Sequence, residues 1–191
     1  MNKTLNRLIR RKLTVLAILA SSSLTNAAVD VTTDIATDTT WSLANSPYTL
    51  KDYIFVTSGA TLTIEAGVTI YADEGTTDEA PALIITQGSK IDANGTAAKP
   101  IIFTSSLEKT QVLTKEDKGK WGGVVILGKA KINANKQGSG DGPNQTPMTW
   151  EVEGLPTAYI YGSGTISAAN RTYGGSDDTD NSGVLRYVSI R

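Results

Sequence analysis

Three aspartates near the end of the chain form the densest group of carboxylates that could do chemistry. They are Asp177, Asp178 and Asp180, and Arg186 follows them. Oxygen atoms from Asp178, Asp180 and Ser182 have the spacing of the opening of a calcium loop, because Ca²⁺ takes several hard oxygen ligands. The position of a closing glutamate is Ser189, so the match is partial. The preferred interpretation is an exposed acidic turn before a strand.

The chain of 191 residues contains no histidine and no cysteine. Catalytic triads and the common zinc sites use these residues, so such mechanisms are excluded. Glycoside hydrolysis needs two carboxyls at a fixed separation across the scissile bond. Asp177 and Asp178 are adjacent in sequence and do not promise that separation. We therefore assign no catalytic residue.

Aromatic residues form a second candidate group, in the long non-repetitive segment 136–182. Its members are Trp150, Tyr159, Tyr161 and Tyr173. Aromatic faces with neighbouring amides and hydroxyls would suit a glycan-binding surface. The same side chains could instead pack this segment against the rest of the fold. We prefer packing and keep glycan binding as the second hypothesis.

Residues 1–27 predict a secretory signal peptide. Five basic residues precede the apolar run 13–20, and small polar residues follow it. The run is shorter than the roughly 20 residues that span a bilayer, so we expect a mature chain without a membrane span. The expected location is the outer surface of a bacterial cell or the extracellular medium.

Removal of this segment makes the chain acidic. Of the 18 Lys and Arg residues, five lie in the signal, so 13 remain against 19 Asp and Glu, a formal charge of −6. Nucleic-acid binding is therefore not expected. Without cysteine, an exported fold must be held by hydrogen bonds and packing instead of disulfides.

A repeated phrase indicates the elements that position these residues. The phrase consists of isoleucine, a variable residue, alanine and then Asp or Asn, and it occurs at 70–73, 91–94 and 132–135. Self-similarity near 20 residues is typical of a solenoid, whose coils bury their apolar faces against one another. Asp73, Asn94 and Asn135 would then form a structural ladder of hydrogen bonds at one corner.

Three kinds of short strand recur in the same order, which predicts a triangular coil. The first kind is 61–64, 83–86 and 124–127, the second 68–70, 89–91 and 129–132, and the third 100–105 and 184–190. Alternation of apolar and polar residues places Leu62, Ile64, Val68 and Ile70 on the inward face. Stacked coils would pair each strand in parallel with its equivalents.

The coil pattern divides the chain after the signal into two parts. Residues 28–50 are expected to form an irregular N-terminal cap, with Trp41 over the first coil. Residues 51–191 are expected to form the coils. The polar segments 106–120 and 136–182 are expected to leave the coil at its corners, as long loops do.

These phrases resemble the right-handed parallel β-helix, or pectin-lyase-like, proteins of bacterial surfaces and secretomes. The resembling segments are 59–70, 93–105, 120–128 and 180–190. The resemblance implies an all-β solenoid of a few coils with long corner loops. Members usually run for many more coils, so we expect a truncated N-terminal portion, with end-to-end self-association through the exposed last coil as the alternative.

Two functional interpretations follow from the resemblance. The first is a non-catalytic exported protein, adhesin-like or structural, whose loops contact glycans or surface proteins. The alternative is a calcium-dependent polysaccharide lyase or its remnant, for which the resemblance implies calcium on Asp177, Asp178 and Asp180 and a base such as Arg186. No other cofactor is expected.

Overall fold

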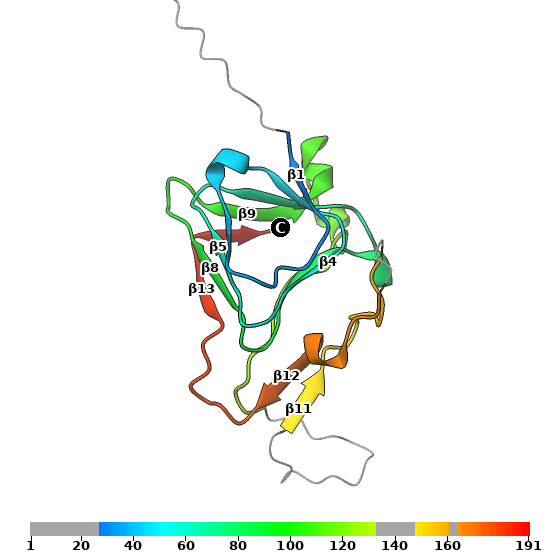
Figure 1. The fold of residues 1–191 in the computed structure, drawn as a ribbon. Helices are drawn as coiled ribbons and strands as arrows, with labels where there is room; N and C mark the ends of the chain where they lie inside the picture. The colour runs from blue at the N-terminus through cyan, green and yellow to red at the C-terminus, as the bar shows by residue number, and fades with distance from the viewer. Residues whose placement is uncertain (1–26, 133–147, 161–163) are drawn as a thin grey trace, which may run out of the picture.

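The computed structural model describes residues 27–132, 148–160 and 164–191. These residues form strands and short 3₁₀ turns, without an α-helix among them. In this part of the chain, no helix is long and apolar enough to cross a bilayer. The strands wind into a triangular coil, and a hairpin lies beside it (Figure 1).

Three parallel sheets form the walls of the coil. Sheet A contains β1 (Val29–Val31), β3 (Tyr48–Leu50), β6 (Thr69–Ala72), β9 (Ile101–Ser105) and β14 (Val188–Ile190). Sheet B contains β4 (Tyr53–Val56), β7 (Ala82–Ile85) and β10 (Gly123–Ile126). Sheet C contains β2 (Thr39–Trp41), β5 (Thr61–Ile64), β8 (Lys90–Asn94) and β13 (Gly183–Arg186).

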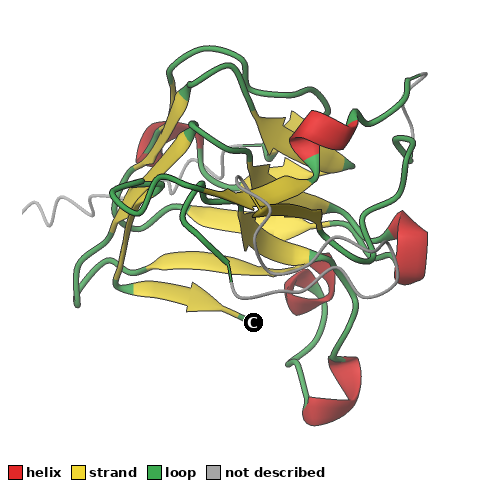
Figure 2. Cartoon of the chain, turned by 90° about the horizontal axis from the view of Figure 1, so that it is seen from below, coloured by secondary structure: helices red, strands yellow, loops and turns green. Residues whose placement is uncertain are grey.

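The chain visits the sheets in the fixed order A, B, C, and every pair of neighbouring strands within a sheet is parallel. The expected all-β, right-handed parallel β-helix is therefore confirmed. Figure 2 shows the strands stacked along the coil and the 3₁₀ turns on its outside. Parallel pairing at every level holds the stack together by backbone hydrogen bonds.

The interior of the coil is one apolar core. The predicted inward residues Leu62, Ile64, Val68 and Ile70 are each at most 2% exposed, so this expectation is confirmed. Equivalent side chains stack from coil to coil, because successive strands are in register. Burial of such side chains stabilises the fold by about 2 kcal/mol each.

Residues 28–50 are regular, which corrects the expectation of an irregular cap. They already supply β1, an isolated bridge from Ile35 to Val56 in sheet B, and β2. Trp41 lies in β2 and stacks on Tyr48 with ring centroids 5.0 Å apart. The segment looked irregular in sequence because its strands have only three residues and its corners are polar. Its 3₁₀ turn η1 is Leu43–Asn45.

The repeated isoleucine phrase does not mark equivalent positions. Ile70 lies in sheet A, where it is paired with Tyr48 and Phe103, whereas Ile91 lies in sheet C opposite Leu62. The spacing of 21 residues between Ile70 and Ile91 therefore compares positions in two different walls and is not the length of one coil. True equivalents in sheet A are 22 and 33 residues apart, since corner loops differ in length.

The predicted ladder of Asp73, Asn94 and Asn135 is wrong for its first two members. Asp73 follows β6 in sheet A and forms an ion pair with Lys51 at 2.5 Å. Asn94 ends β8 in sheet C, opposite Arg186. Different walls of the coil separate them, so they cannot share a corner. Asn135 lies outside the described residues.

Two strand assignments also need correction. Residues 129–132 form no strand. Residues 184–190 form two strands, because Tyr187 has φ of 49° and turns the chain from sheet C to sheet A. The strands β3 and β4 were missed, although the run Tyr53 to Val56 is continuously apolar, as in strands buried on both faces.

Two long segments leave the coil at its corners. The first joins β9 to β10 and contains the 3₁₀ turns η3 (Ser106–Lys109) and η4 (Lys115–Asp117). The second joins β10 to β13 and contains β11 (Met148–Glu151), the 3₁₀ turn η5 (Ala168–Asn170) and β12 (Thr172–Gly175). A shorter corner carries η2 (Thr77–Glu79). β11 and β12 pair antiparallel as a hairpin beside the coil (Figure 1).

Candidate functional site

The segment between β10 and β13 packs on the outer face of sheet B. That face presents Tyr53, Phe55, Ala82 and Ile84, which form a second apolar cluster with Leu127 and Ile166. The strands β4 and β7 are therefore buried on both faces. Partly buried residues of the segment complete the cluster; they are Val152, Leu155, Tyr159, Ile160 and Tyr173. Apolar packing thus fixes the segment to the coil.

Tyr159 is bound to the first two coils through Asp34. Its hydroxyl donates a hydrogen bond of 2.7 Å to Asp34 Oδ2, while Asp34 Oδ1 accepts one of 3.0 Å from the backbone N–H of Phe55. The rings of Tyr159 and Phe55 meet edge to face, 5.9 Å apart. Burial, helped by the bond to Asp34, raises the pKa of the Tyr159 hydroxyl. Tyr159 therefore anchors the segment between β10 and β13 to the first two coils.

Asp52 provides a second carboxylate anchor beside Tyr159. It is 4% exposed, and its Oδ1 accepts hydrogen bonds from the backbone N–H groups of Tyr53 at 2.7 Å and Ile160 at 2.9 Å. A buried carboxylate is stable only where such donors replace water. Asp34 and Asp52 together fix residues 159 and 160 on the flank of the coil.

Gln87 ties the hairpin to the corner between β7 and β8. Its Nε2 donates to the backbone carbonyls of Gly128 at 2.8 Å and Gly174 at 2.6 Å. The backbone N–H of Gly174 also donates to the Gly128 carbonyl at 2.9 Å. These bonds place the start of the long segment and its hairpin against the same corner.

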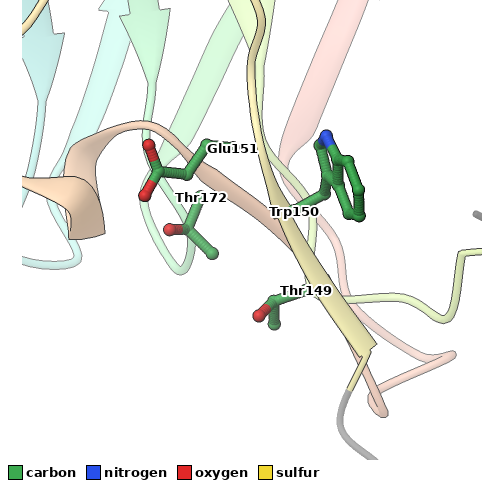
Figure 3. A pocket seen from close by; sticks show the side chains of 4 residues that line it. All are labelled: Thr149, Trp150, Glu151 and Thr172. Atoms are coloured by element: carbon green, nitrogen blue, oxygen red, sulfur yellow. The ribbon is translucent and has the colours of Figure 1, made fainter. Parts of the chain in front are cut away.

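Trp150 and Tyr173 lie directly opposite each other in the hairpin. Tyr173 packs on the second apolar cluster, but Trp150 is not among the described residues that contact it. Trp150 instead borders a hollow of about 360 Å³ that is also lined by Thr149, Glu151 and Thr172. Figure 3 shows the indole on one side of β11 and the three polar side chains on the other. Among the described aromatic candidates, Trp150 is thus the one that borders a hollow and does not pack on the second apolar cluster.

The remaining predicted aromatic residue, Tyr161, lies outside the described residues.

The polar side of the hairpin is held in place by an ion pair of 3.1 Å between Glu151 and Arg171. Arg171 is 14% exposed at its side chain, so this contact is partly shielded from water. Shielding strengthens an ion pair relative to one on an open surface.

The three aspartates of the acidic turn bind three different partners. Asp177 Oδ1 accepts from the N–H and the hydroxyl of Thr179, at 3.0 and 2.7 Å. Asp178 forms an ion pair of 2.7 Å with Lys131. Asp180 Oδ2 accepts from the backbone N–H of Lys129 at 3.0 Å. These carboxylates do not converge, and the described residues contain no group of three acidic side chains placed to hold a metal.

Local hydrogen bonds also explain the charge state of this turn. The Thr179 hydroxyl lowers the pKa of Asp177, and the Lys131 ammonium lowers the pKa of Asp178. Asp178 in turn raises the pKa of Lys131. Arg186 lies in β13 opposite Asn94 and is exposed, and within the described chain no ion pair joins it to these aspartates. The base and the calcium ligands of the lyase hypothesis are thus not brought together.

Residues 33–191 match the family described as the pectate-lyase-like beta helix domain. The chain belongs to this family. No curated protein and no solved structure gives a match. The matched residues of this pectate-lyase-like β-helix domain include the hairpin and the acidic turn.

Sequence reasoning missed the residues that anchor the long segment of this β-helix domain. Asp34 and Asp52 stand at corners in the first two coils, and each precedes an apolar position, which is the only signal that they carry. Gln87 has no signal at all, because its acceptors are backbone carbonyls 41 and 87 residues further along the chain. A search of the sequence for clustered acidic residues therefore finds the acidic turn and misses Asp34, Asp52 and Gln87.

Tyr159→Phe is expected to lower the free energy of unfolding at neutral pH by about 1.5 kcal/mol, because Asp34 loses a hydrogen bond. A raised folded-state pKa means that the unfolded chain loses this proton first as the pH rises. The stability advantage of Tyr159 is therefore full below about pH 10 and declines above it. Urea titrations of both proteins from about pH 7 to about pH 11 measure this difference. A difference that grows with pH would contradict the assignment.

Proposed function

We propose that the chain is a non-catalytic, exported surface or extracellular β-helix protein, in which the coil is a scaffold and the β11–β12 hairpin contacts glycans. The observation that supports the scaffold role is the separation of the candidate catalytic groups. Asp177, Asp178 and Asp180 each hold the turn through their own donors, and Arg186 lies apart from them. A metal-assisted elimination would need these groups at one substrate.

Export is supported by the sequence of residues 1–27, with its basic start, short apolar run and small residues. The fold suits such a location. A chain without disulfides relies on ladders of backbone hydrogen bonds, and each strand inside the three sheets has two parallel neighbours. Stability of this kind does not depend on the redox state of the surroundings.

Glycan contact is supported by the surroundings of Trp150. Trp150 lines a hollow of about 360 Å³ together with Thr149, Glu151 and Thr172, whose polar groups lie on the other side of β11 from the indole (Figure 3). Ligand sites commonly combine an apolar face with a few polar groups that fix orientation. Tyr159 is used differently, since its ring contacts Phe55 and its hydroxyl binds Asp34. Trp150 is therefore the aromatic residue on which the proposal depends.

Trp150→Ala is expected to reduce retention of the chain on a glycan array by at least about tenfold, because an aromatic anchor in a binding surface typically contributes about 2 kcal/mol. Tyr173→Phe is a matched control within the same hairpin, because it keeps the ring that packs on the coil. Thermal unfolding of each variant shows whether the hairpin is retained. Unchanged retention by a folded Trp150→Ala protein would contradict glycan contact at this site.

The non-catalytic part of the proposal is open to a separate measurement. Incubation of the chain with polygalacturonate and calcium, followed by ultraviolet absorbance of unsaturated products, reports lyase activity directly. A calcium-dependent rise that is lost in Arg186→Ala would replace the scaffold role with the lyase alternative. Loss of glycan retention and gain of product are independent outcomes, so each part stands or fails alone.

A further inference from the structure

The corner after β8 carries a chemically reactive pair of residues, Asn94 followed by Gly95. Asparagine is one of the thermolabile residues. The backbone nitrogen of the residue that follows it can attack the side-chain amide carbon, and at Gly95 no Cβ obstructs that approach. Asn94 is exposed, and within the described chain no hydrogen bond restrains its side-chain amide. The pair is therefore accessible to water and free to react once the backbone allows it.

The fold requires the glycine of this pair. A Cβ atom at Gly95 would lie 2.7 Å from the carbonyl oxygen of Tyr187 and 3.2 Å from that of Arg186. Both oxygens belong to the backbone of the next coil, so no side-chain movement would make room for a larger residue. Within the described chain, no contact of the same kind requires asparagine at position 94. Close packing of two coils thus imposes the residue that makes Asn94 reactive.

The pairing of β13 with β8 restrains the same nitrogen. Asn94 lies opposite Arg186 in the parallel register, and the backbone N–H of Gly95 donates to the Arg186 carbonyl at 2.9 Å. The N–H of Ile101, beyond the corner, donates to the Tyr187 carbonyl at 3.0 Å. A nitrogen that is fixed in this way can neither lose its proton nor turn toward the Asn94 side chain. The reaction therefore requires β13 to separate from β8.

The residue that joins β13 to β14 lowers the cost of such a separation. Tyr187 has φ of 49°, in the left-handed region, which costs a residue other than glycine about 1 kcal/mol. Local openings need less free energy than unfolding of the whole domain, and strain in the native state reduces that free energy further. The corner that protects Gly95 is thus held by a strained neighbour.

We infer that Asn94 is a site of spontaneous deamidation and that separation of β13 from β8 controls its rate. The Gly95 nitrogen loses its proton to the solvent and forms a bond to Cγ of Asn94. The bond from Cγ to Nδ2 then breaks, and Nδ2 takes up a proton and leaves as ammonia. Water opens the resulting succinimide at either carbonyl, which gives aspartate or isoaspartate. Water is the only co-reactant, and no atom is oxidised or reduced.

Isoaspartate at position 94 would make the opening permanent. Its main chain runs through the former side chain, which adds a carbon atom between β8 and Gly95. Gly95 could then no longer keep its N–H on the Arg186 carbonyl while Ala93 stays opposite Leu185. The modification would therefore convert a transient separation of β13 into a lasting one. This inference goes beyond the proposed function and depends neither on glycan contact nor on export.

The first test compares the full chain in its folded state and in urea. Mass spectrometry of proteolytic peptides measures conversion of amide to acid, and an isoaspartate methyltransferase assay measures isoaspartate. Asn181 is the internal control, because it is also exposed but precedes Ser182 and its Oδ1 accepts from the Gly183 N–H. In urea, Asn94 should react at least about tenfold faster than Asn181, since Ser182 has a side chain that hinders attack. Equal rates at the two asparagines would overturn the inference.

Folding should slow the reaction of Asn94 at least about tenfold, because it proceeds only through the open state. Asn94→Gln should abolish the modified peptide without loss of stability, since a larger ring closes far more slowly and the side chain has no partner within the described chain. An equal rate for Asn94 in the folded chain and in urea would overturn control by β13.

A second test concerns the separation itself. Gly183→Ala, whose Cβ would overlap the Ile91 carbonyl, should raise the rate at Asn94 toward its value in urea, whereas Gly119→Ala should not. Hydrogen exchange of the Gly95 N–H in the unaltered chain gives an independent measure, even if Gly183→Ala does not fold. Its protection gives the fraction of time that the corner is open. Deamidation should proceed at the urea rate multiplied by this fraction, and a faster reaction would overturn the inference.

Discussion

Gly183→Ala is expected to detach the last two strands from the coil. Gly183 begins β13 with φ of 119°, and a Cβ atom there would lie 1.9 Å from the carbonyl oxygen of Ile91 in β8. No side-chain movement relieves a clash with backbone, so β13 must separate from β8. We expect the free energy of unfolding to fall by at least about 3 kcal/mol, measured as a lower urea midpoint.

Gly119→Ala serves as the control for this substitution. Gly119 also has a positive φ, of 70°, but no atom lies within 4 Å of the position that its Cβ would take. Only the backbone preference of alanine opposes that change, and it amounts to about 1 kcal/mol. Equal losses in the two variants would show that conformational strain, and not the close approach of β8, makes glycine necessary at 183.

Phe55→Ala is expected to release the long segment from sheet B before the coil unfolds. Phe55 is fully buried on the outer face of β4, where it contacts Tyr159. Truncation of a buried phenylalanine costs about 3 to 5 kcal/mol. Part of the lost stabilisation is the contact between sheet B and the segment that joins β10 to β13. Trypsin should therefore cleave this segment after Arg171 faster than in the unaltered chain, at temperatures well below the main unfolding transition. Mass spectrometry of timed samples identifies that cleavage.

Phe103→Ala is the matched comparison. Phe103 is equally buried but points into the interior of the coil. Its loss should lower the main unfolding transition by a similar amount without faster cleavage after Arg171 in the folded protein. If Phe55→Ala leaves cleavage unchanged while the transition falls, the segment does not depend on the second apolar cluster for its position.

The inward faces of the strands were predicted more accurately than the assignment of each strand to sheet A, B or C. Period-two alternation identified the inward face, because Leu62 and Ile64 must be buried and their threonine neighbours need not be. The same alternation is present in every wall, so it could not tell sheet A from sheet C. Ile70 and Ile91 were therefore matched across two walls, and the Asp73–Asn94 ladder failed with them.

The candidate site was less predictable for a related reason. Asp177, Asp178 and Asp180 are close in sequence, but a short turn lets each carboxylate accept from a different nearby donor. The anchors that do organise the long segment join residues 108 and 125 positions apart, Asp52 with Ile160 and Asp34 with Tyr159. Contacts of this range depend on the completed fold, and one sequence carries no signal for them.

The three walls of the coil differ in what remains open to solvent. The outer face of sheet B lies under the long segment, and on sheet A Lys109 reaches over Thr49 and the Tyr71 ring. Sheet C carries no comparable cover within the described chain, and Thr40, Lys90, Asn94 and Arg186 are exposed along it. Within the described chain, sheet C is therefore the wall whose polar outer face stays open to solvent. Each added coil would lengthen this polar surface by one strand spacing.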